Sequence, residues 1–263
     1  ACYTCMNSVK FHFHGKAAHA AGHPFDGRSA LDAVELMNVA ANYMREHVIP
    51  DVRLHYATIS DGAPNTVPPE CTVWYYVRAP KRHQVEEVYQ WLCDCAKGAA
   101  LMTQTTFDIE FLTGCSEVMP NDVLEKVMHQ ACKDVGPPKF TEADHAFAKE
   151  MSKTYPEILA RDRAIMKNEY GVNGDDKYLC DVVFDAIIED RSVAPGSTDV
   201  GDVSHVVPTY QVYVAAQGLG CPGHSWQMTA YSGHHVGFAA MLCAAKILGL
   251  SGIRLMENPE LVS

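Results

Sequence analysis

The sequence has few basic residues. Its 263 residues include 21 Lys and Arg against 32 Asp and Glu, for a formal net charge of -11, and no block of Lys or Arg interrupts this excess. An acidic surface gains nothing from meeting a phosphate backbone or an anionic lipid surface. The composition therefore argues against a nucleic-acid partner and against a membrane partner.

The sequence also lacks a long uninterrupted apolar run and a regular cysteine spacing. The most apolar stretch, VGFAAMLCAAKILGL, contains Lys246 and is shorter than the roughly 20 residues that span a bilayer. Ten cysteines scattered among apolar residues are typical of reduced thiols, which favours a cytoplasmic protein. The sequence begins with Ala1 and has no signal-type segment, so we expect residue 1 to be an internal position of a longer polypeptide.

The first part of the chain alternates between strand and helix periodicities. Apolar and polar residues alternate over SVKFHFH (residues 8–14), the pattern of a half-buried strand. A helical period follows Ser29, a candidate N-cap, and two strand patterns, a second helical pattern and the strand pattern TTFDIEFLT come after it. This βαββαβ order predicts a ferredoxin-like sandwich over residues 1–113.

The second part, residues 114–263, has a different pattern. It predicts a helix over 122–135, helical stretches around TEADHAFAKEMSKTY, an irregular span to about residue 178, a strand over YQVYVAA (210–216) and a final helix from about Ser232. Strands that lead into loops and then helices indicate part of an α/β layer structure. Two or so strands cannot complete such a sheet, so we expect only a portion of an α/β domain.

Four histidines fall within residues 12–23. His12 and His14 share the polar face of the first predicted strand, where no third ligand has suitable spacing, so we interpret them as surface residues rather than as a zinc site. His19 lies in the loop GKAAHAAGHP, whose small residues let another surface approach closely. Taken alone, a histidine in such a position is more often an ordinary loop residue than a functional one.

Three more loops carry polar residues at the ends of predicted elements. Asn65 lies between prolines in PNTVPPE, which stiffen its backbone and fix its amide. Ser197, Thr198 and Asp199 lie in the loop GSTDVGDVS, and His224 follows a predicted strand in GCPGHSWQ. Each loop alone is a weak signal, but together their positions favour one polar site.

These motifs resemble those of the aminoacylase, carboxypeptidase G and amidohydrolase family of di-metal peptidases. The strings that carry the resemblance are, in order, GKAAHAA, GRSALDAV, PNTVPPE, RAP, KGAALMTQTT, GSTDVGDVS and PGHSWQ, and they cover nearly the whole chain. The resemblance implies an α/β protein with an α+β lid: a ferredoxin-like dimerisation domain at residues 1–113, followed at 114–263 by the C-terminal portion of a zinc-peptidase catalytic domain.

The resemblance also implies roles for single residues. His19 matches the lid histidine that reaches into an active site, usually that of the partner subunit, and helps to polarise the scissile carbonyl. Asn65 matches a lid residue that contacts substrate, residues 197–199 match a loop that lines the site, and His224 matches the last metal-ligand histidine. The family's other ligands and its general-base glutamate precede the lid, so we expect zinc or manganese in the complete enzyme and weak binding or none to this chain alone.

The expected function is that of a segment of a metal-dependent amidohydrolase, which cleaves the amide of an N-acyl amino acid such as p-aminobenzoyl-glutamate. The lid would join two identical chains, or this chain and a related subunit. The alternative is a catalytically inactive dimerisation or binding module. A small-molecule-binding regulatory domain is a weaker alternative because it has no use for His224. Arg28 and Arg78 are possible substrate-carboxylate anchors, although arginines at such positions are more often surface charges.

Overall fold

The computed structural model describes residues 2–184, 193–194 and 196–261, and the chain falls into two compact units. Unit 1 comprises Ala1–Pro120 and Arg191–Thr209, and unit 2 comprises Asn121–Asp190 and Tyr210–Ser263. The segment 191–209 therefore belongs with the N-terminal part of the chain, a division that no single cut in the sequence reproduces.

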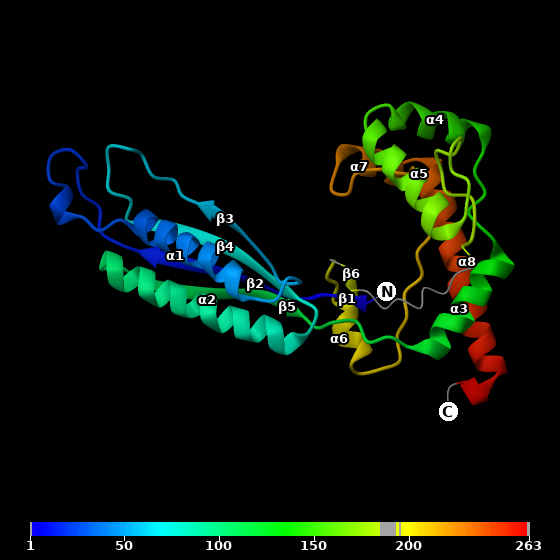
Figure 1. Ribbon diagram of the computed structural model, residues 1–263, viewed down its shortest axis with the longest axis horizontal. Coiled ribbons are helices and arrows are strands. Elements are labelled where there is room, and N and C mark those ends of the chain that lie inside the picture. Colours follow the sequence, from blue (N-terminus) through cyan, green and yellow to red (C-terminus); the bar gives the residue numbers. More distant parts are fainter. Residues whose placement is uncertain (1, 185–192, 195, 262–263) are drawn as a thin grey trace. The chain divides into compact units, whose positions relative to one another are not determined.

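Unit 1 is built around a four-stranded antiparallel sheet with strand order β3-β4-β2-β5. The strands are β2 (Cys5–His14), β3 (Arg53–Ile59), β4 (Glu70–Ala79) and β5 (Thr106–Cys115), and the helices are α1 (Ala30–Met44) and α2 (Arg82–Thr103) (Figure 1). The smaller elements are β1 (Cys2–Tyr3), which pairs in parallel with β6 (Val193–Ala194), η1 (Pro24–Asp26), η2 (Arg45–His47) and α6 (Val200–Ser204). The predicted ferredoxin-like order of elements is confirmed.

The core of unit 1 follows from the alternation along its strands. Val9, Phe11 and Phe13 of β2 are fully buried, and they belong to one apolar cluster that joins the sheet to α1 and α2. Burying one such side chain stabilises the fold by about 1.5–3 kcal/mol. The side chain of Ser29 caps α1, as predicted, by accepting a hydrogen bond of 3.1 Å from the Asp32 amide. Local signals and core packing therefore specify the same structure.

Unit 2 is formed mainly by helices among the described residues. They are α3 (Asp122–Val135), α4 (Glu142–Ser152), α5 (Pro156–Tyr170), α7 (Trp226–Ser232), α8 (His235–Glu257) and the short η3 (Pro259–Leu261). Helix α5 lies in the span that we predicted to be irregular. It begins with Pro156 at a first-turn position and ends at Gly171 in the left-handed region (φ 65°), two boundary signals that the sequence carries.

The strand predicted over residues 210–216 does not form, and this prediction is wrong. A strand needs a neighbour whose backbone groups pair with its own. Among the described residues of unit 2, the only β-type pairing is a single bridge between Leu179 and Gly218. The alternating pattern of 210–216 is therefore present, but it forms no strand with the described residues.

Helix α8 is longer than the apolar run seen in the sequence. Its 23 residues are long and apolar enough to cross a membrane by length and composition alone, so the expectation that this region is too short is wrong. Core helices of soluble proteins meet the same criterion, and α8 packs against α3 through Cys243 and Ile247. The length of α8 is therefore weak support for a membrane span.

Candidate functional site

The loop that carries His19 begins directly after β2 and folds back on itself. Lys16 pairs with Arg28 at the base of the loop, and their backbone amides donate hydrogen bonds of 2.8 and 2.9 Å to each other's carbonyls. A Cβ atom on Gly15 would lie 2.0 Å from the Arg28 carbonyl oxygen. Only glycine fits this close approach of two backbones, so Gly15 closes the base of the loop.

His19 is exposed, and its ring is oriented by its own loop. The amides of Ala21 and Gly22 donate hydrogen bonds of 3.2 and 2.9 Å to Nδ1 of His19. Because Nδ1 accepts both bonds, the proton of the neutral imidazole is on Nε2. His19 therefore presents an Nε2–H donor away from the loop backbone, as a group that stabilises a developing oxyanion must.

Asn65 lies next to the His19 loop. Its carbonyl accepts a hydrogen bond of 3.1 Å from the Ala20 amide, His19 pairs with Thr66, and the Val67 amide donates to Ala18 over 2.9 Å. The loop after β2 and the loop between β3 and β4 thus lie together at the same end of unit 1 (Figure 1). The structure brings these two predicted residues into one exposed tip.

The second predicted loop, residues 197–199, is attached to the other end of the sheet. The hydroxyl of Ser197 lies 3.0 Å from that of Thr4 and accepts a hydrogen bond of 3.4 Å from Arg78. Thr198 is half-buried and Asp199 is exposed. Arg78, near the end of β4, therefore helps to hold this loop in place. Its residue type alone did not indicate this contact.

Helix α6, which follows this loop, is tightly bound to the chain that leaves β5. A Cβ atom on Gly201 would lie 2.0 Å from the Ser116 carbonyl oxygen. Asp202 accepts a hydrogen bond of 2.9 Å from the Ser116 amide, and Ser204 accepts one of 2.8 Å from the Met119 amide. These contacts explain why residues 191–209 belong to unit 1.

Glu117 forms a polar cluster beside α6. Its carboxylate accepts a hydrogen bond of 2.9 Å from the Cys5 thiol and lies 3.5 Å from the Lys81 ammonium. Burial alone would raise the pKa of Glu117, but the thiol and Lys81 together hold it below its usual value. Burial and the nearby carboxylate raise the pKa of Cys5 to about 12, so this thiol stays protonated and unreactive. All cysteines with described side chains are free.

The two groups of predicted residues in unit 1 are far apart. Ser197 lies beside Thr4 and Arg78, where β2 begins, whereas His19 and Asn65 lie beyond His14, where β2 ends. The ten residues of β2 rise by roughly 3.3 Å each, which separates its ends by about 30 Å. His19 therefore cannot meet residues 197–199 of its own chain without dismantling the sheet.

His224 lies in unit 2, in the loop before α7. It is exposed and has a positive φ of 54°, a conformation that few non-glycine residues adopt. Ser225, which follows it, caps α7 by accepting a hydrogen bond of 3.3 Å from the Met228 amide. Holding a non-glycine residue in this conformation costs of order 1–3 kcal/mol of conformational free energy, and such residues cluster at functional sites. The conformation of His224 therefore supports its selection as a candidate.

The described residues contain no group of three or more His, Cys, Asp or Glu side chains that could hold a metal ion. A zinc site needs three or four such ligands around one point. His224 thus belongs to no such group among the described residues, and these residues do not by themselves fit a metal centre.

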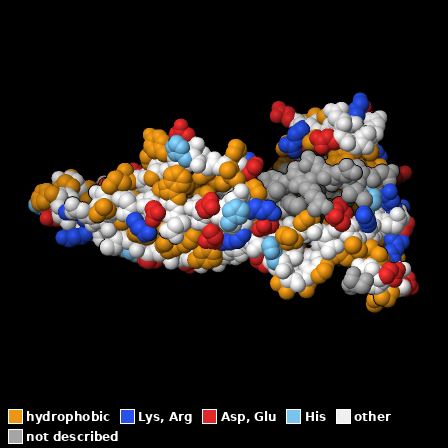
Figure 2. Space-filling view, turned by 60° about the horizontal axis from the view of Figure 1, so that its bottom comes forward, with side chains coloured by type: hydrophobic (Ala, Val, Ile, Leu, Met, Phe, Trp, Pro, Cys, Tyr) orange, Lys and Arg blue, Asp and Glu red, His pale blue; other side chains and the backbone are white. Residues whose placement is uncertain are grey.

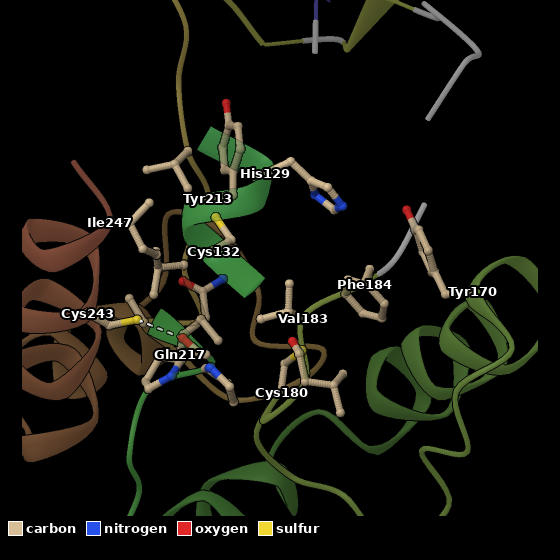
Figure 3. Close-up of a pocket in the computed structure, with 18 of the residues that line it drawn as sticks. His129, Cys132, Tyr170, Cys180, Val183, Phe184, Tyr213, Gln217, Cys243 and Ile247 are labelled. Carbon is tan, nitrogen blue, oxygen red and sulfur yellow. Dashed lines mark hydrogen bonds between the residues drawn. The ribbon is translucent and has the colours of Figure 1, made fainter. Parts of the chain in front are cut away.

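A cavity of about 680 Å³ lies in unit 2. Figure 3 shows the rings of Tyr170 and Phe184 close together on its wall, and their centroids are 4.4 Å apart. The other labelled residues come from α3, α8 and the two segments 180–184 and 210–217: His129, Cys132, Cys180, Val183, Tyr213, Gln217, Cys243 and Ile247. None of the predicted site residues lines this cavity.

The cavity walls contain unpaired polar groups. Nε2 of His129 and Oε1 of Gln211 are buried without a hydrogen-bond partner. Apart from Tyr213, the backbone of 210–216 makes no hydrogen bond to another described residue, and that of 180–184 accepts only one, from the Cys180 thiol. Both segments are half-buried or exposed, and neither forms a strand among the described residues.

Comparison with known protein families assigns most of unit 1 to a family. Residues 6–101 match the family described as "Peptidase dimerisation domain". This part of the chain is a peptidase dimerisation domain. The family resemblance inferred from the motifs is confirmed, and the domain covers β2 through most of α2.

Two curated relatives extend the similarity beyond the dimerisation domain. Over 97% of this chain, the sequence is 36% identical to a subunit of the p-aminobenzoyl-glutamate hydrolase of Escherichia coli (strain K12) and 27% identical to Xaa-Arg dipeptidase of Mus musculus. The chain covers 55% and 49% of these proteins, so it spans about half the length of the curated relatives that it matches. Both relatives are hydrolases by name.

Among solved structures, the chain is similar to an aminobenzoyl-glutamate utilization protein from Klebsiella pneumoniae. The identity is 20% and the TM-score is 0.45, over 51% of this chain and 34% of that one.

The dimerisation domain also carries a charged cluster that the sequence pattern did not reveal. His14 lies between two carboxylates on the neighbouring strands, with Nδ1 2.6 Å from Glu70 and Nε2 2.5 Å from Asp108. The hydrogen bonds to Asp108 and then to Glu70 raise the pKa of His14. His12 likewise contacts Glu110 at 3.2 Å. The carboxylates reach these histidines because β4 and β5 pair with β2 in a particular register. The sequence pattern of one strand does not show which residues of the neighbouring strands lie beside it.

Proposed function

We propose that this chain is the segment of a metal-dependent amidohydrolase that carries the dimerisation domain. The substrate is an N-acyl amino acid such as p-aminobenzoyl-glutamate, and the reaction is hydrolysis of its amide. The proposal is supported by the 36% identity to the p-aminobenzoyl-glutamate hydrolase subunit over 97% of this chain. Its residue-level content is carried by one observation, the position and ring orientation of His19.

In this proposal His19 acts on the active site of a second subunit. Its Nε2–H donates a hydrogen bond to the oxyanion that develops on the scissile carbonyl, and Asn65 contacts the same substrate. The strand length of about 30 Å between His19 and residues 197–199 supports this arrangement, because one chain cannot bring both groups to one substrate. A two-fold dimer allows each chain to supply its tip to the other.

The metal belongs to the complete enzyme in this proposal. Peptidases with this dimerisation domain are generally metal-dependent, but the described residues of this chain do not assemble a ligand set. We infer that His224 supplies one ligand and that the portion present only in the longer relatives supplies the others. Zinc or manganese bound there would polarise the carbonyl and activate water. The segment 210–216 supports the need for that portion, because its residues other than Tyr213 make no backbone hydrogen bond to another described residue.

The first experiment replaces His19 in the complete enzyme. We expect His19→Ala to lower kcat for p-aminobenzoyl-glutamate by roughly a hundredfold or more with folding intact, since loss of one oxyanion donor has that effect. His12→Ala and His14→Ala are matched controls, because both residues lie on the adjacent sheet face and neither has a proposed role in the reaction. Unchanged kcat in the His19 variant, or an equal loss in all three, would reject the role of His19.

A second experiment tests whether His19 acts between subunits. His19→Ala and His224→Ala are each expected to be inactive alone, and the two are then mixed and allowed to exchange subunits. Random mixing makes about half of the dimers heterodimers with one intact site of two, so about a quarter of wild-type activity should return. No recovery despite demonstrated exchange would mean that His19 serves its own chain.

One observation favours a second candidate function, an inactive dimerisation module: the described residues contain no metal-ligand cluster. The complete protein separates the two candidates. A module would dimerise but would neither bind zinc or manganese stoichiometrically nor hydrolyse p-aminobenzoyl-glutamate.

A further inference from the structure

The loop that carries His19 also presents an aromatic side chain to solvent. Phe25 lies in η1 and is 72% exposed, although Gly27, at the end of this turn, is buried. Figure 2 shows exposed hydrophobic side chains at the left end of unit 1, where this loop lies in Figure 1. A single exposed apolar residue is common in folded proteins, so exposure alone does not mark a binding site. The way in which the loop holds Phe25 is the second observation.

The backbone around Phe25 is fixed by hydrogen bonds within the loop. The Asp26 amide donates a hydrogen bond of 3.2 Å to the His23 carbonyl. Nη1 of Arg28 donates to the Phe25 carbonyl over 3.3 Å and to the Gly27 carbonyl over 2.6 Å. The ring of Phe25 therefore projects from a backbone that is already ordered, which reduces the entropy that a contact with this ring would cost.

Arg28 is itself held by Gln104, the residue that follows α2 as its C-cap. Nε of Arg28 donates a hydrogen bond of 2.8 Å to Oε1 of Gln104. Gln104 has a φ of 55°, in the left-handed region where glycine is the usual residue at the end of a helix. Glycine has no side chain that could accept the bond from Arg28. Arg28, a possible anchor for a substrate carboxylate by its residue type, therefore ties the Phe25 turn to the end of α2.

Phe25 and His19 belong to the same folded turn. The His23 amide donates a hydrogen bond of 3.0 Å to the His19 carbonyl. The ring of His23 meets the ring of Phe25 edge-on, with the ring centroids 5.7 Å apart and the planes at 89°. Edge-to-face contact is a favourable arrangement of two aromatic rings. His23 thus joins the two residues, and a site that receives His19 receives Phe25 on the same rigid turn.

The charge beside Phe25 indicates which end of the proposed substrate it faces. The carbonyl that His19 polarises is bonded to an aryl ring on one side, and through the amide nitrogen to glutamate, with its two carboxylates, on the other. Asp26 follows Phe25 directly and is exposed, so its carboxylate repels the glutamate end. An uncharged aryl ring meets no such repulsion and gains from contact with another aromatic ring.

We propose that Phe25 determines the acyl specificity of this enzyme: its ring packs against the aryl ring of the acyl group in the site that His19 serves. Phe25 then favours N-aroyl amino acids over N-alkanoyl amino acids. This inference rests on the proposed function, because it needs His19 to act at the scissile carbonyl. It adds the substrate class that the loop selects and the residue that selects it.

The experiment measures the substrate selectivity of the complete enzyme. kcat/KM is determined for p-aminobenzoyl-glutamate and for N-acetyl-glutamate, whose acyl group has no ring and is too short to reach Phe25. We expect Phe25→Ala to lower kcat/KM for the aroyl substrate about tenfold and to leave that for the acetyl substrate within about twofold. If the acetyl compound is hydrolysed too slowly, its inhibition constant against the aroyl substrate replaces kcat/KM.

Two further variants are the controls. Phe25→Tyr keeps the ring and should retain the selectivity of the wild type within about twofold. Leu101→Ala removes a side chain that is 82% exposed on α2, so it matches the loss of exposed apolar surface, and it should change neither substrate.

The outcomes separate this inference from the proposed function. Equal losses for both substrates in Phe25→Ala would overturn the inference, because Phe25 would then support the loop or contact protein rather than the aryl ring. Unchanged values for both substrates, or a Phe25→Tyr variant as impaired as Phe25→Ala, would also overturn it. A wild-type enzyme that does not hydrolyse p-aminobenzoyl-glutamate would instead reject the proposed function. A His19→Ala loss with unchanged selectivity in Phe25→Ala rejects the role of Phe25 alone.

Discussion

The two units of this chain differ in how completely they satisfy their own backbone. Unit 1 pairs all four strands of its main sheet and buries one continuous core between that sheet and two helices. Unit 2 buries two small apolar clusters among its described residues, and residues 210–216 other than Tyr213 make no backbone hydrogen bond to another described residue. A strand-like pattern therefore produces a strand only where the same chain supplies its neighbours.

The largest expected effect contrasts the two cores. Phe11→Ala removes a fully buried ring from β2 and should destabilise unit 1 by about 3–5 kcal/mol. Ile247→Ala, at a nearly buried site beside the unit 2 cavity, should cost about 2 kcal/mol, the low end for such changes, because the side chain already lacks neighbours on one side. Urea unfolding followed by hydrogen exchange in β2 and α8 measures both.

A matched surface control is Phe238→Ala, since Phe238 is half exposed on α8 and should change stability by less than about 0.5 kcal/mol. A larger cost for Ile247→Ala than for Phe11→Ala would show that the core of unit 2 is packed at least as well as that of unit 1, and the contrast between the units would fail.

The next effect concerns backbone pairing directly. In this chain alone, the amides of Gln211, Val212 and Val214 should exchange with solvent at least about a hundredfold faster than those of Val9 and Phe11, which lie in the central strand β2. Mass-spectrometric hydrogen exchange resolves these segments. Equal protection would mean that residues 210–216 have strand partners and that unit 2 is complete.

The smallest effect is the pH dependence of the dimerisation domain. The pKa of His14 is raised in the folded state above the usual 6.5, so its pairing with Asp108 and Glu70 stabilises unit 1 fully below pH 6.5. That stabilisation is lost as the pH rises through the folded pKa. Because all three side chains are substantially exposed, solvent screening limits the effect to about 0.5–1 kcal/mol.

The measurement compares the wild-type chain with His14→Gln, which cannot titrate, in urea unfolding between about pH 5.5 and about pH 9. The wild-type advantage should shrink as the pH rises, and His12→Gln serves as the control because His12 contacts only one carboxylate. A difference between wild type and His14→Gln that is constant with pH would contradict this account.

Much of the dimerisation domain could be predicted from local patterns. The alternation over residues 8–14 predicted strand β2, and Ser29 predicted the start of α1. Both features depend only on residues close together in the sequence. The same method failed for residues 210–216, where the alternation was real but no partner strand exists among the described residues. It also missed α5, although Pro156 and Gly171 mark its two ends, because its polar sequence resembles that of a loop.

The sequence by itself determined the order of strands and helices in unit 1, and it selected the loops that carry His19, Asn65, residues 197–199 and His224 by residue type. Only the tertiary structure decided that His19 and Asn65 meet at one tip while residues 197–199 are held at the opposite end of β2. Periodicity depends on neighbours within a few residues, so it can be read along the chain. Register, close backbone approach and the distance between two loops depend on which distant segments pack together, and that choice is made by the whole core at once.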